Sequence, residues 1–146
     1  MPEQETLERA REDAREGKSP STQAGEFVRE EMHHVREGKH GAKSAKQVVA
    51  IGLSKARRAG VKLGAPKGKA STRQKAAQDT RAAKKRSTKK SATRSRATTN
   101  ALKLESRTSA SHRALSRQAK TAAAQRGKQN RRKAAMKAAQ TRRKAA

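Results

Sequence analysis

The sequence has no cysteine, tryptophan or tyrosine, and Phe27 is its only aromatic residue. The absence of cysteine excludes disulfides, thiolate zinc sites and thiol redox chemistry. Proteins that bind single-stranded nucleic acid stack bases on aromatic rings, and each stack contributes about 1–3 kcal/mol. Hydrophobic residues make up 31% of the chain and include many alanines, whereas a packed domain carries roughly half. We therefore expect a small folded element rather than a large core.

Long apolar runs are also missing. No segment approaches the roughly 18 apolar residues of a membrane span. The first residues, Met1 to Glu5, are acidic and lack the basic and apolar regions of a secretion signal. We expect a cytoplasmic protein with no membrane partner.

Acidic residues are nearly absent from the second half of the chain. Residues 65–146 contain 26 Lys or Arg against Asp79 and Glu105, so 24 of the 27 net positive charges lie there. Residues 1–38 carry a net charge of −4, and residues 39–64 carry seven basic residues and no acidic one. Like charges at this density oppose compact folding and attract a polyanion, which in a cell is usually DNA or RNA.

Charge and composition divide the chain into three parts. For residues 1–18 we predict an acidic helical segment that is marginal and solvated, because Leu7 is the only large apolar residue between Glu3 and Glu16. Residues 19–64 predict a helical hairpin domain, and residues 65–146 a basic low-complexity tail rich in Ala, Lys and Arg. Repulsion between like charges three or four residues apart opposes helix formation in such a tail. Phosphates that neutralise these charges remove the repulsion and favour the helix.

The predicted hairpin has recognisable helix ends. Its first helix starts near Ser21 and stops at Gly38, a residue that tolerates the left-handed conformation of a helix C-terminus. In the second helix Ser44 and Gln47 match a capping box, and Gly60 again marks the end. The fold class we predict is therefore all-α: a small helical hairpin, similar to a helix-turn-helix, with mostly disordered or conditionally helical flanks. Its core is small enough that a homodimer through the hairpin would complete it.

The candidate nucleic-acid-binding residues are basic side chains of the second helix and clusters in the tail. On the helix they are Lys43, Lys46, Lys55, Arg57 and Arg58. In the tail they are Lys84, Lys85, Arg86, Lys89, Lys90, Arg131, Arg132, Lys133, Arg142, Arg143 and Lys144. Phosphate contacts of this kind position a protein on nucleic acid without reading its sequence.

Other chemistry finds little support. His33, His34 and His40 cluster near two glutamates, but adjacent helical histidines point about 100° apart and no HExxH motif or cysteine accompanies them, so we predict no metal site. The glycines of residues 60–68 lack the spacing of a phosphate loop. No nucleophile–base set or carboxylate pair is evident. We expect no enzyme activity, catalytic residue, cofactor or small-molecule substrate.

The segment Glu37–Gly41 followed by Ser44–Gly60 resembles a family of small basic bacterial proteins that carry a domain of unknown function. The resemblance covers about residues 26–66 and implies a bacterial source, without an activity or site residues. The tail resembles bacterial histone-H1-like proteins in composition only, which implies nucleoid association.

Together these features predict a histone-like protein that binds duplex DNA without sequence specificity, through phosphate contacts of its basic tail. The tail has no aromatic residue to stack bases, which favours duplex over single-strand binding. We expect duplex DNA rather than RNA as the partner. The same composition also fits two alternative functions: an RNA- or ribosome-associated basic protein, and a protein-interaction module tethered by a basic tail.

Overall fold

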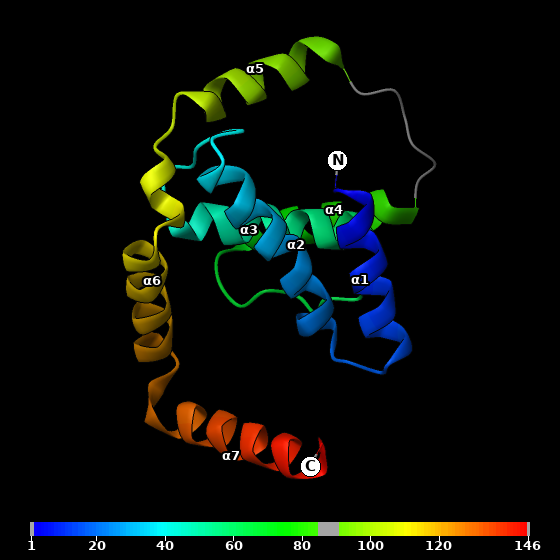
Figure 1. Ribbon diagram of the computed structural model, residues 1–146, viewed down its shortest axis with the longest axis vertical. Helices are drawn as coiled ribbons and strands as arrows, with labels where there is room; N and C mark the ends of the chain where they lie inside the picture. Colours follow the sequence, from blue (N-terminus) through cyan, green and yellow to red (C-terminus); the bar gives the residue numbers. More distant parts are fainter. Residues whose placement is uncertain (1, 85–90, 146) are drawn as a thin grey trace. The chain divides into compact units, whose positions relative to one another are not determined.

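The computed structural model describes residues 2–84 and 91–145, and within these ranges every regular element is helical (Figure 1). The elements are α1 (Gln4–Arg15), α2 (Pro20–Arg36), α3 (Ala45–Arg58), α4 (Ala70–Lys84), α5 (Ala92–Lys103), a short 3-10 helix η1 (Arg107–Ala110), α6 (His112–Gln125) and α7 (Gly127–Ala145). The chain falls into two compact units, Met1–Ser111 and His112–Ala146.

Helices α2 and α3 form the centre of the first unit. Serine hydroxyls cap both N-termini: the Ser19 hydroxyl accepts a hydrogen bond from the Thr22 N–H and the Ser44 hydroxyl from the Gln47 N–H. The two helices approach so closely that a β-carbon on Gly52 would lie 2.7 Å from the Cα of Val28. Only glycine fits this contact between the two helices without displacing backbone.

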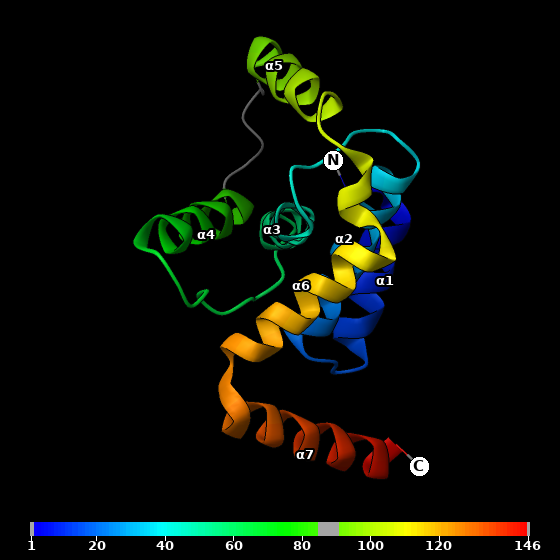
Figure 2. The same cartoon turned by 90° about the vertical axis from the view of Figure 1, so that its left-hand side faces the viewer.

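The apolar core is small and lies in two clusters. Phe27 and Ala56 are buried with two alanines of α1 and α2, and Leu7, Leu53, Val61 and Leu63 pack against them. At the other end of the α2–α3 pair, Val35 and Val48 are buried with Ala42 and Ala110. Figure 2 shows α3 nearly end-on, with α2 and α1 on one side and α4 on the other. The core is therefore shared by several helices rather than confined to two.

The acidic segment at the N-terminus is packed against α2. Thr6 and Ala10 of α1 are buried, Leu7 packs against the core that contains Phe27, and the Nε of Arg9 lies 2.9 Å from Oε2 of Glu26. The prediction of a marginal, solvated helix was wrong because small residues, Thr6 and Ala10, add to Leu7 in the contact with the core.

Helix α4 lies in the predicted tail but packs on α3. Asp79 is 2% exposed, and its carboxylate accepts hydrogen bonds from the Ser54 hydroxyl at 2.7 Å and from the Arg58 Nε at 2.8 Å. Ala76, one turn earlier, is also buried. A single acidic residue thus anchors fifteen residues of basic helix.

The connector between α2 and α3 is held by a segment from much later in the chain. The Gly41 N–H donates to the Leu102 carbonyl at 2.8 Å, and the Ala42 N–H donates to the Ser106 carbonyl at 3.1 Å. A β-carbon on Gly41 would meet backbone atoms of Glu105. Arg36 of α2 also donates, from its Nε, to the Ala110 carbonyl at 3.0 Å.

The second unit contains two basic helices. Gly127, with φ of 71°, stands between α6 and α7 and allows the chain to leave one helix and begin the next. Leu115 of α6 is half-buried, whereas every described side chain of α7 is exposed.

The predicted fold class is wrong in two respects. The helical hairpin is not a free-standing domain, because α1, α4 and η1 pack on it. Its flanks are not mostly disordered or dependent on a partner for their helices, because α1 and α4–α7 are formed without one. Ala, Lys, Arg and Gln have high helix propensity, and this propensity outweighs the repulsion between the like charges.

Candidate nucleic-acid interface

Helix α7 presents positive charge on two sides. Its basic side chains separate at 100° per residue into two stripes. The arginine-rich stripe, within an arc of about 120°, consists of Lys128, Arg131, Arg132, Arg142 and Arg143. The lysine stripe, within about 40°, consists of Lys133, Lys137 and Lys144. The helix contains no acidic residue, so these cations have no carboxylate partner on their own helix.

Helix α6 has a basic side and an apolar side. At 100° per residue Arg113, Arg117 and Lys120 fall within an arc of about 60° and are exposed. Leu115 and Ala122 lie roughly opposite and are partly buried. This amphipathic pattern orients the three cations toward one side of the helix.

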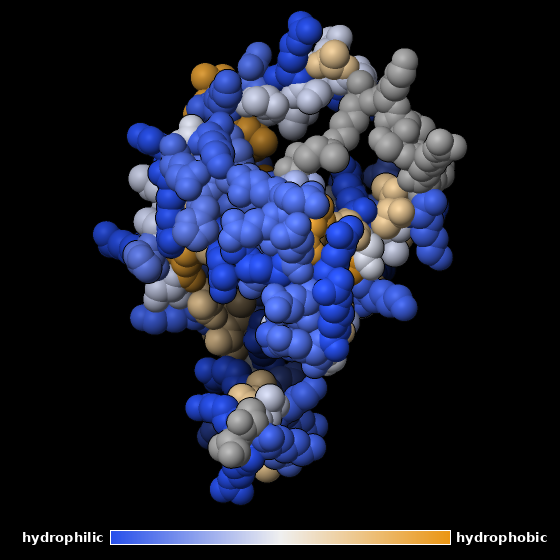
Figure 3. Space-filling model, turned by 45° about the vertical axis from the view of Figure 1, so that its right-hand side comes forward, coloured by the Kyte–Doolittle hydropathy of each residue, from blue (hydrophilic) through white to orange (hydrophobic). Residues whose placement is uncertain are grey.

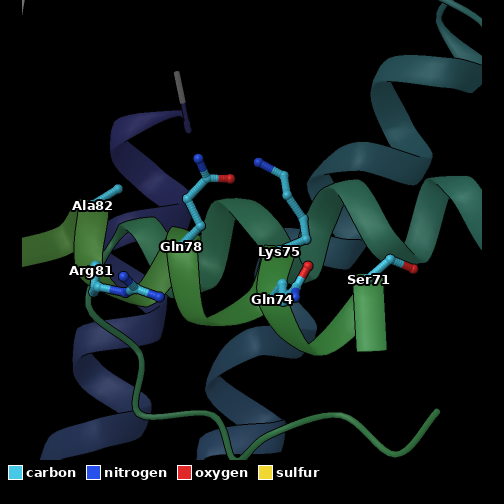
Figure 4. Close-up of a pocket in the computed structure, with 6 residues that line it drawn as sticks. All are labelled: Ser71, Gln74, Lys75, Gln78, Arg81 and Ala82. Atoms are coloured by element: carbon cyan, nitrogen blue, oxygen red, sulfur yellow. The ribbon is translucent and has the colours of Figure 1, made fainter. Parts of the chain in front are cut away.

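A polar hollow of about 680 Å³ lies along α4. Ser71, Gln74, Lys75, Gln78, Arg81 and Ala82 line it (Figure 4). Figure 4 shows Lys75 and Gln78 projecting from the same side of the helix. Lys75 is already paired with Asp79, its ammonium 3.2 Å from Oδ1, so Arg81 and the two amides are the groups of the lining that can meet phosphate oxygens, which accept hydrogen bonds and carry negative charge.

Two of the residues predicted to bind nucleic acid lie at the start of α3 and are accessible to a partner. Lys43 and Lys46 are exposed, and neither forms an ion pair in residues 2–84 or 91–145. Gln47 uses its side-chain carbonyl oxygen to accept the Lys43 N–H at 2.8 Å. It therefore serves as part of the helix cap.

The other three α3 residues predicted to bind nucleic acid make ion pairs or hydrogen bonds within the first unit. The Lys55 ammonium lies 2.9 Å from Oε1 of Glu30. Arg57 is buried and donates to the Gly64 carbonyl at 3.2 Å. Arg58 pairs with Asp79. We leave these three out of the proposed surface because binding a phosphate would require breaking these contacts.

The remaining predicted residues are in the tail. Lys84 ends α4 and is exposed. Lys85, Arg86, Lys89 and Lys90 lie outside the described residues. Arg131, Arg132, Lys133, Arg142, Arg143 and Lys144 are all exposed on α7. The predicted set thus falls in both units, and each unit carries basic surface of its own.

The acidic residues of the first unit are largely paired with cations close to them. Glu3 pairs with His34 and Lys39, and hydrogen bonds from these two side chains lower the pKa of its carboxyl to about 2. Lys18 pairs with Asp13 and Glu16, which raise the pKa of its ammonium. Among the described residues, no ion pair involves a residue after Asp79.

Buried carboxylates on α2 share one ammonium of α3. Burial alone raises the pKa of the Glu30 carboxyl, but hydrogen bonds, chiefly from Lys55 and from the Glu3 N–H, outweigh it and leave the pKa below its usual value. Burial alone lowers the pKa of Lys55, and hydrogen bonds to Glu31 and Glu30 raise it above its usual value. These charges stabilise the fold and are not available to a polyanion.

The sequence analysis missed the role of Asp79. Burial alone raises the pKa of its carboxyl, yet hydrogen bonds from Ser54, Arg58 and Lys75 hold the pKa below its usual value. The signal that could have identified it is its rarity, because it is one of only two acidic residues in 65–146. In a chain region of that charge, a lone carboxylate is the natural partner for cations of a neighbouring helix.

No protein-family model, curated protein or solved structure matches this chain. The resemblance to small basic bacterial proteins and to histone-H1-like tails therefore stays a prediction. Among the described residues, none of the helices combines the length and apolar character that crossing a membrane requires. Hydrophilic side chains dominate the face shown in Figure 3.

Proposed function

We propose that this protein binds duplex DNA without strong sequence preference, through phosphate contacts of its basic helices. The observation that carries the proposal is α7: a nineteen-residue helix whose described side chains are exposed, with basic residues in two stripes and no acidic residue. Like charges three or four positions apart destabilise a helix by a few tenths of a kcal/mol per pair. A phosphate backbone removes that penalty and releases its counterions.

Charge pairing distinguishes the basic helices from the rest of the molecule. The carboxylates of Glu30 and Glu31 both pair with Lys55, and that of Asp79 pairs with Arg58, so all three lie against cations of the first unit. Helices α5, α6 and α7 have no acidic residue in their sequences. An external polyanion is therefore the partner that matches their charge.

Base stacking contributes nothing to this mode of binding. Phe27, the only aromatic residue, is 1% exposed and lies in the core. Single-strand binding proteins depend on exposed aromatic rings, so the duplex backbone is the better fit. Gln47 is occupied as a cap, and the basic side chains address phosphates, which carry no sequence information directly.

A salt series tests the proposal. Affinity of the full-length protein is measured by fluorescence anisotropy for a duplex of mixed sequence, for structured RNA and for single-stranded DNA, between about 50 and 200 mM salt. The logarithm of the duplex association constant should fall linearly with the logarithm of salt concentration, with a slope of about −0.9 per phosphate contacted. Two duplexes of unrelated sequence should bind equally.

Two variants that lose the same charge provide the control. Arg131→Gln with Arg132→Gln removes two cations of α7, and Arg11→Gln with Arg15→Gln removes two exposed cations of α1. The α7 variant should weaken duplex binding and make the salt slope shallower, while the α1 variant should change little. Equal effects of the two variants, or tighter binding of RNA at every salt concentration, would overturn the proposal.

A further inference from the structure

Two histidines and a buried glutamate meet where the α2–α3 connector folds back onto α2. Glu31 and His34 lie one turn apart on α2, and His40 comes from the connector. The Glu31 side chain is 1% exposed, and the His34 and His40 rings are 12% and 15% exposed. One ring nitrogen from each histidine and a Glu31 oxygen all lie within 4.8 Å of one another. The sequence analysis rejected a metal site here, and the structure gives reason to reconsider it.

Each ring has one nitrogen that already faces an oxygen acceptor outside this group. Nε2 of His34 lies 2.9 Å from Oε1 of Glu3, and Nδ1 of His40 lies 2.9 Å from the Gly41 carbonyl oxygen. An ionised carboxylate and a carbonyl only accept hydrogen bonds, so these nitrogens donate. In the neutral rings the lone pairs are then on Nδ1 of His34 and Nε2 of His40. This is how histidines that bind metals are commonly oriented, with the second nitrogen donating to a carboxylate or carbonyl.

The nitrogens that carry the lone pairs both face carboxylates. Nε2 of His40 lies 3.0 Å from Oε1 of Glu31, and Nδ1 of His34 lies 3.8 Å from Oε1 of Glu30. A lone pair against an ionised carboxylate is repulsive unless a proton or a metal ion lies between them. The site therefore calls for a cation at this point.

The charged side chains around these ligand atoms carry a net negative charge, which favours binding of a dication. The Lys55 ammonium lies 2.7 Å from Oε2 of Glu31 and 2.9 Å from Oε1 of Glu30. Two carboxylates and one ammonium leave one negative charge, and Oε1 of Glu31 is the oxygen that faces Nε2 of His40. The Lys39 ammonium lies 3.1 Å from Oε1 of Glu3 and 3.1 Å from Oε2 of Glu37, so these two carboxylates share one cation.

We infer that Glu31, His34 and His40 form a binding site for a transition-metal dication of the zinc type. Two imidazoles and one carboxylate are an established zinc ligand set, with bonds of about 2.0–2.2 Å. Tetrahedral ligands at that distance are about 3.3 Å from one another. Side-chain rotations that move the ligand atoms by roughly an ångström bring the three atoms to that separation. Water completes the coordination. The bound metal joins the connector to α2.

The inference does not depend on nucleic-acid binding, and zinc itself is the probe that tests it. Metal-free full-length protein is titrated with ZnCl₂ near neutral pH and followed by calorimetry, with thermal unfolding as a second readout. Wild-type protein should bind one zinc ion and unfold at a higher temperature. His40→Gln should weaken binding at least tenfold, whereas His33→Gln, which alters an exposed histidine on the same helix as His34, should bind like wild type.

Histidine nitrogen chemical shifts of the wild-type protein provide a measurement that does not rely on a variant folding correctly. Added zinc should shift the ring nitrogens of His34 and His40 and leave those of His33 and His112 in place. Failure of wild-type protein to bind zinc, equal binding by His40→Gln, or shifts confined to His33 or His112 would each overturn the inference.

Discussion

The Nε of Arg58 donates a hydrogen bond to Oδ1 of Asp79 at 2.8 Å, and this pair joins α3 to α4. Lys75 adds a second cationic contact, with its ammonium 3.2 Å from the same oxygen. Arg58 was predicted to bind phosphate, and Asp79 was one of two acidic residues in a tail predicted to be disordered. Their contact converts the beginning of that tail into part of the folded unit.

Replacing Asp79 with Asn should release α4 from α3. The amide cannot pair with Arg58 and Lys75, and the Ser54 hydroxyl loses an ionised acceptor. We expect a loss of about 1–3 kcal/mol in unfolding free energy. Hydrogen exchange should accelerate across residues 70–84. The matched control is Glu105→Gln, because Glu105 is the other acidic residue of this region and forms no ion pair among the described residues; its effect should stay within about 0.5 kcal/mol.

The same carboxylate makes the docking of α4 dependent on pH. The pKa of Asp79 is lowered in the folded state, so its contribution to stability is present above the ordinary pKa of 3.8 and is lost as pH falls through the lowered value. Hydrogen exchange of α4 in wild-type protein should therefore accelerate as pH is reduced below about 4, beyond the intrinsic change in exchange chemistry. Asp79→Asn should lack this additional acceleration, and an identical pH profile for the two proteins would contradict the assignment.

The close crossing of α2 and α3 depends on Gly52. Ala at this position would place its β-carbon 2.7 Å from Val28 Cα, and relieving that overlap should cost about 1–3 kcal/mol. Gly25 is exposed on α2, and a β-carbon added there would meet no atom within 4 Å. Gly25→Ala should therefore stabilise the protein by about 0.5–1 kcal/mol through helix propensity. Chemical denaturation followed by circular dichroism measures both, and changes of the same sign would contradict the proposed contact.

The two stripes of α7 can be compared at equal charge. One triple variant replaces Arg131, Arg132 and Arg142 with Gln, and the other replaces Lys133, Lys137 and Lys144 with Gln. A straight helix contacts a duplex along one side only. The arginine-rich stripe spans a wider arc than the lysine stripe, so we expect it to make more of the phosphate contacts. Its loss should reduce the salt slope for duplex DNA by up to about 2.7, and loss of the lysine stripe should reduce it less. Equal reductions would show that α7 does not engage DNA through the arginine-rich side.

Several local features could be predicted from the sequence because they depend on neighbouring residues. The Ser44 hydroxyl caps α3 at the position that its capping sequence indicates, and Gly38 and Gly60 adopt the left-handed conformation, with φ of 79° and 98°. Phe27 is buried, as its place on the apolar side of its helix indicates. The exposure of the α7 cations also follows from sequence, because a helix with so few large apolar residues has no side to bury.

Contacts between distant segments could not be predicted in the same way. Glu31 interrupts the apolar side of α2, and the sequence contains no indication that Lys55, on the next helix, reaches its carboxylate at 2.7 Å. The meeting of His40 with Glu31 likewise depends on how the connector folds back over α2. Composition by itself determined the partner class that we propose, because net charge is independent of conformation. Only the tertiary structure decided which cations remain available, since burial and ion pairing are set by where separate helices meet.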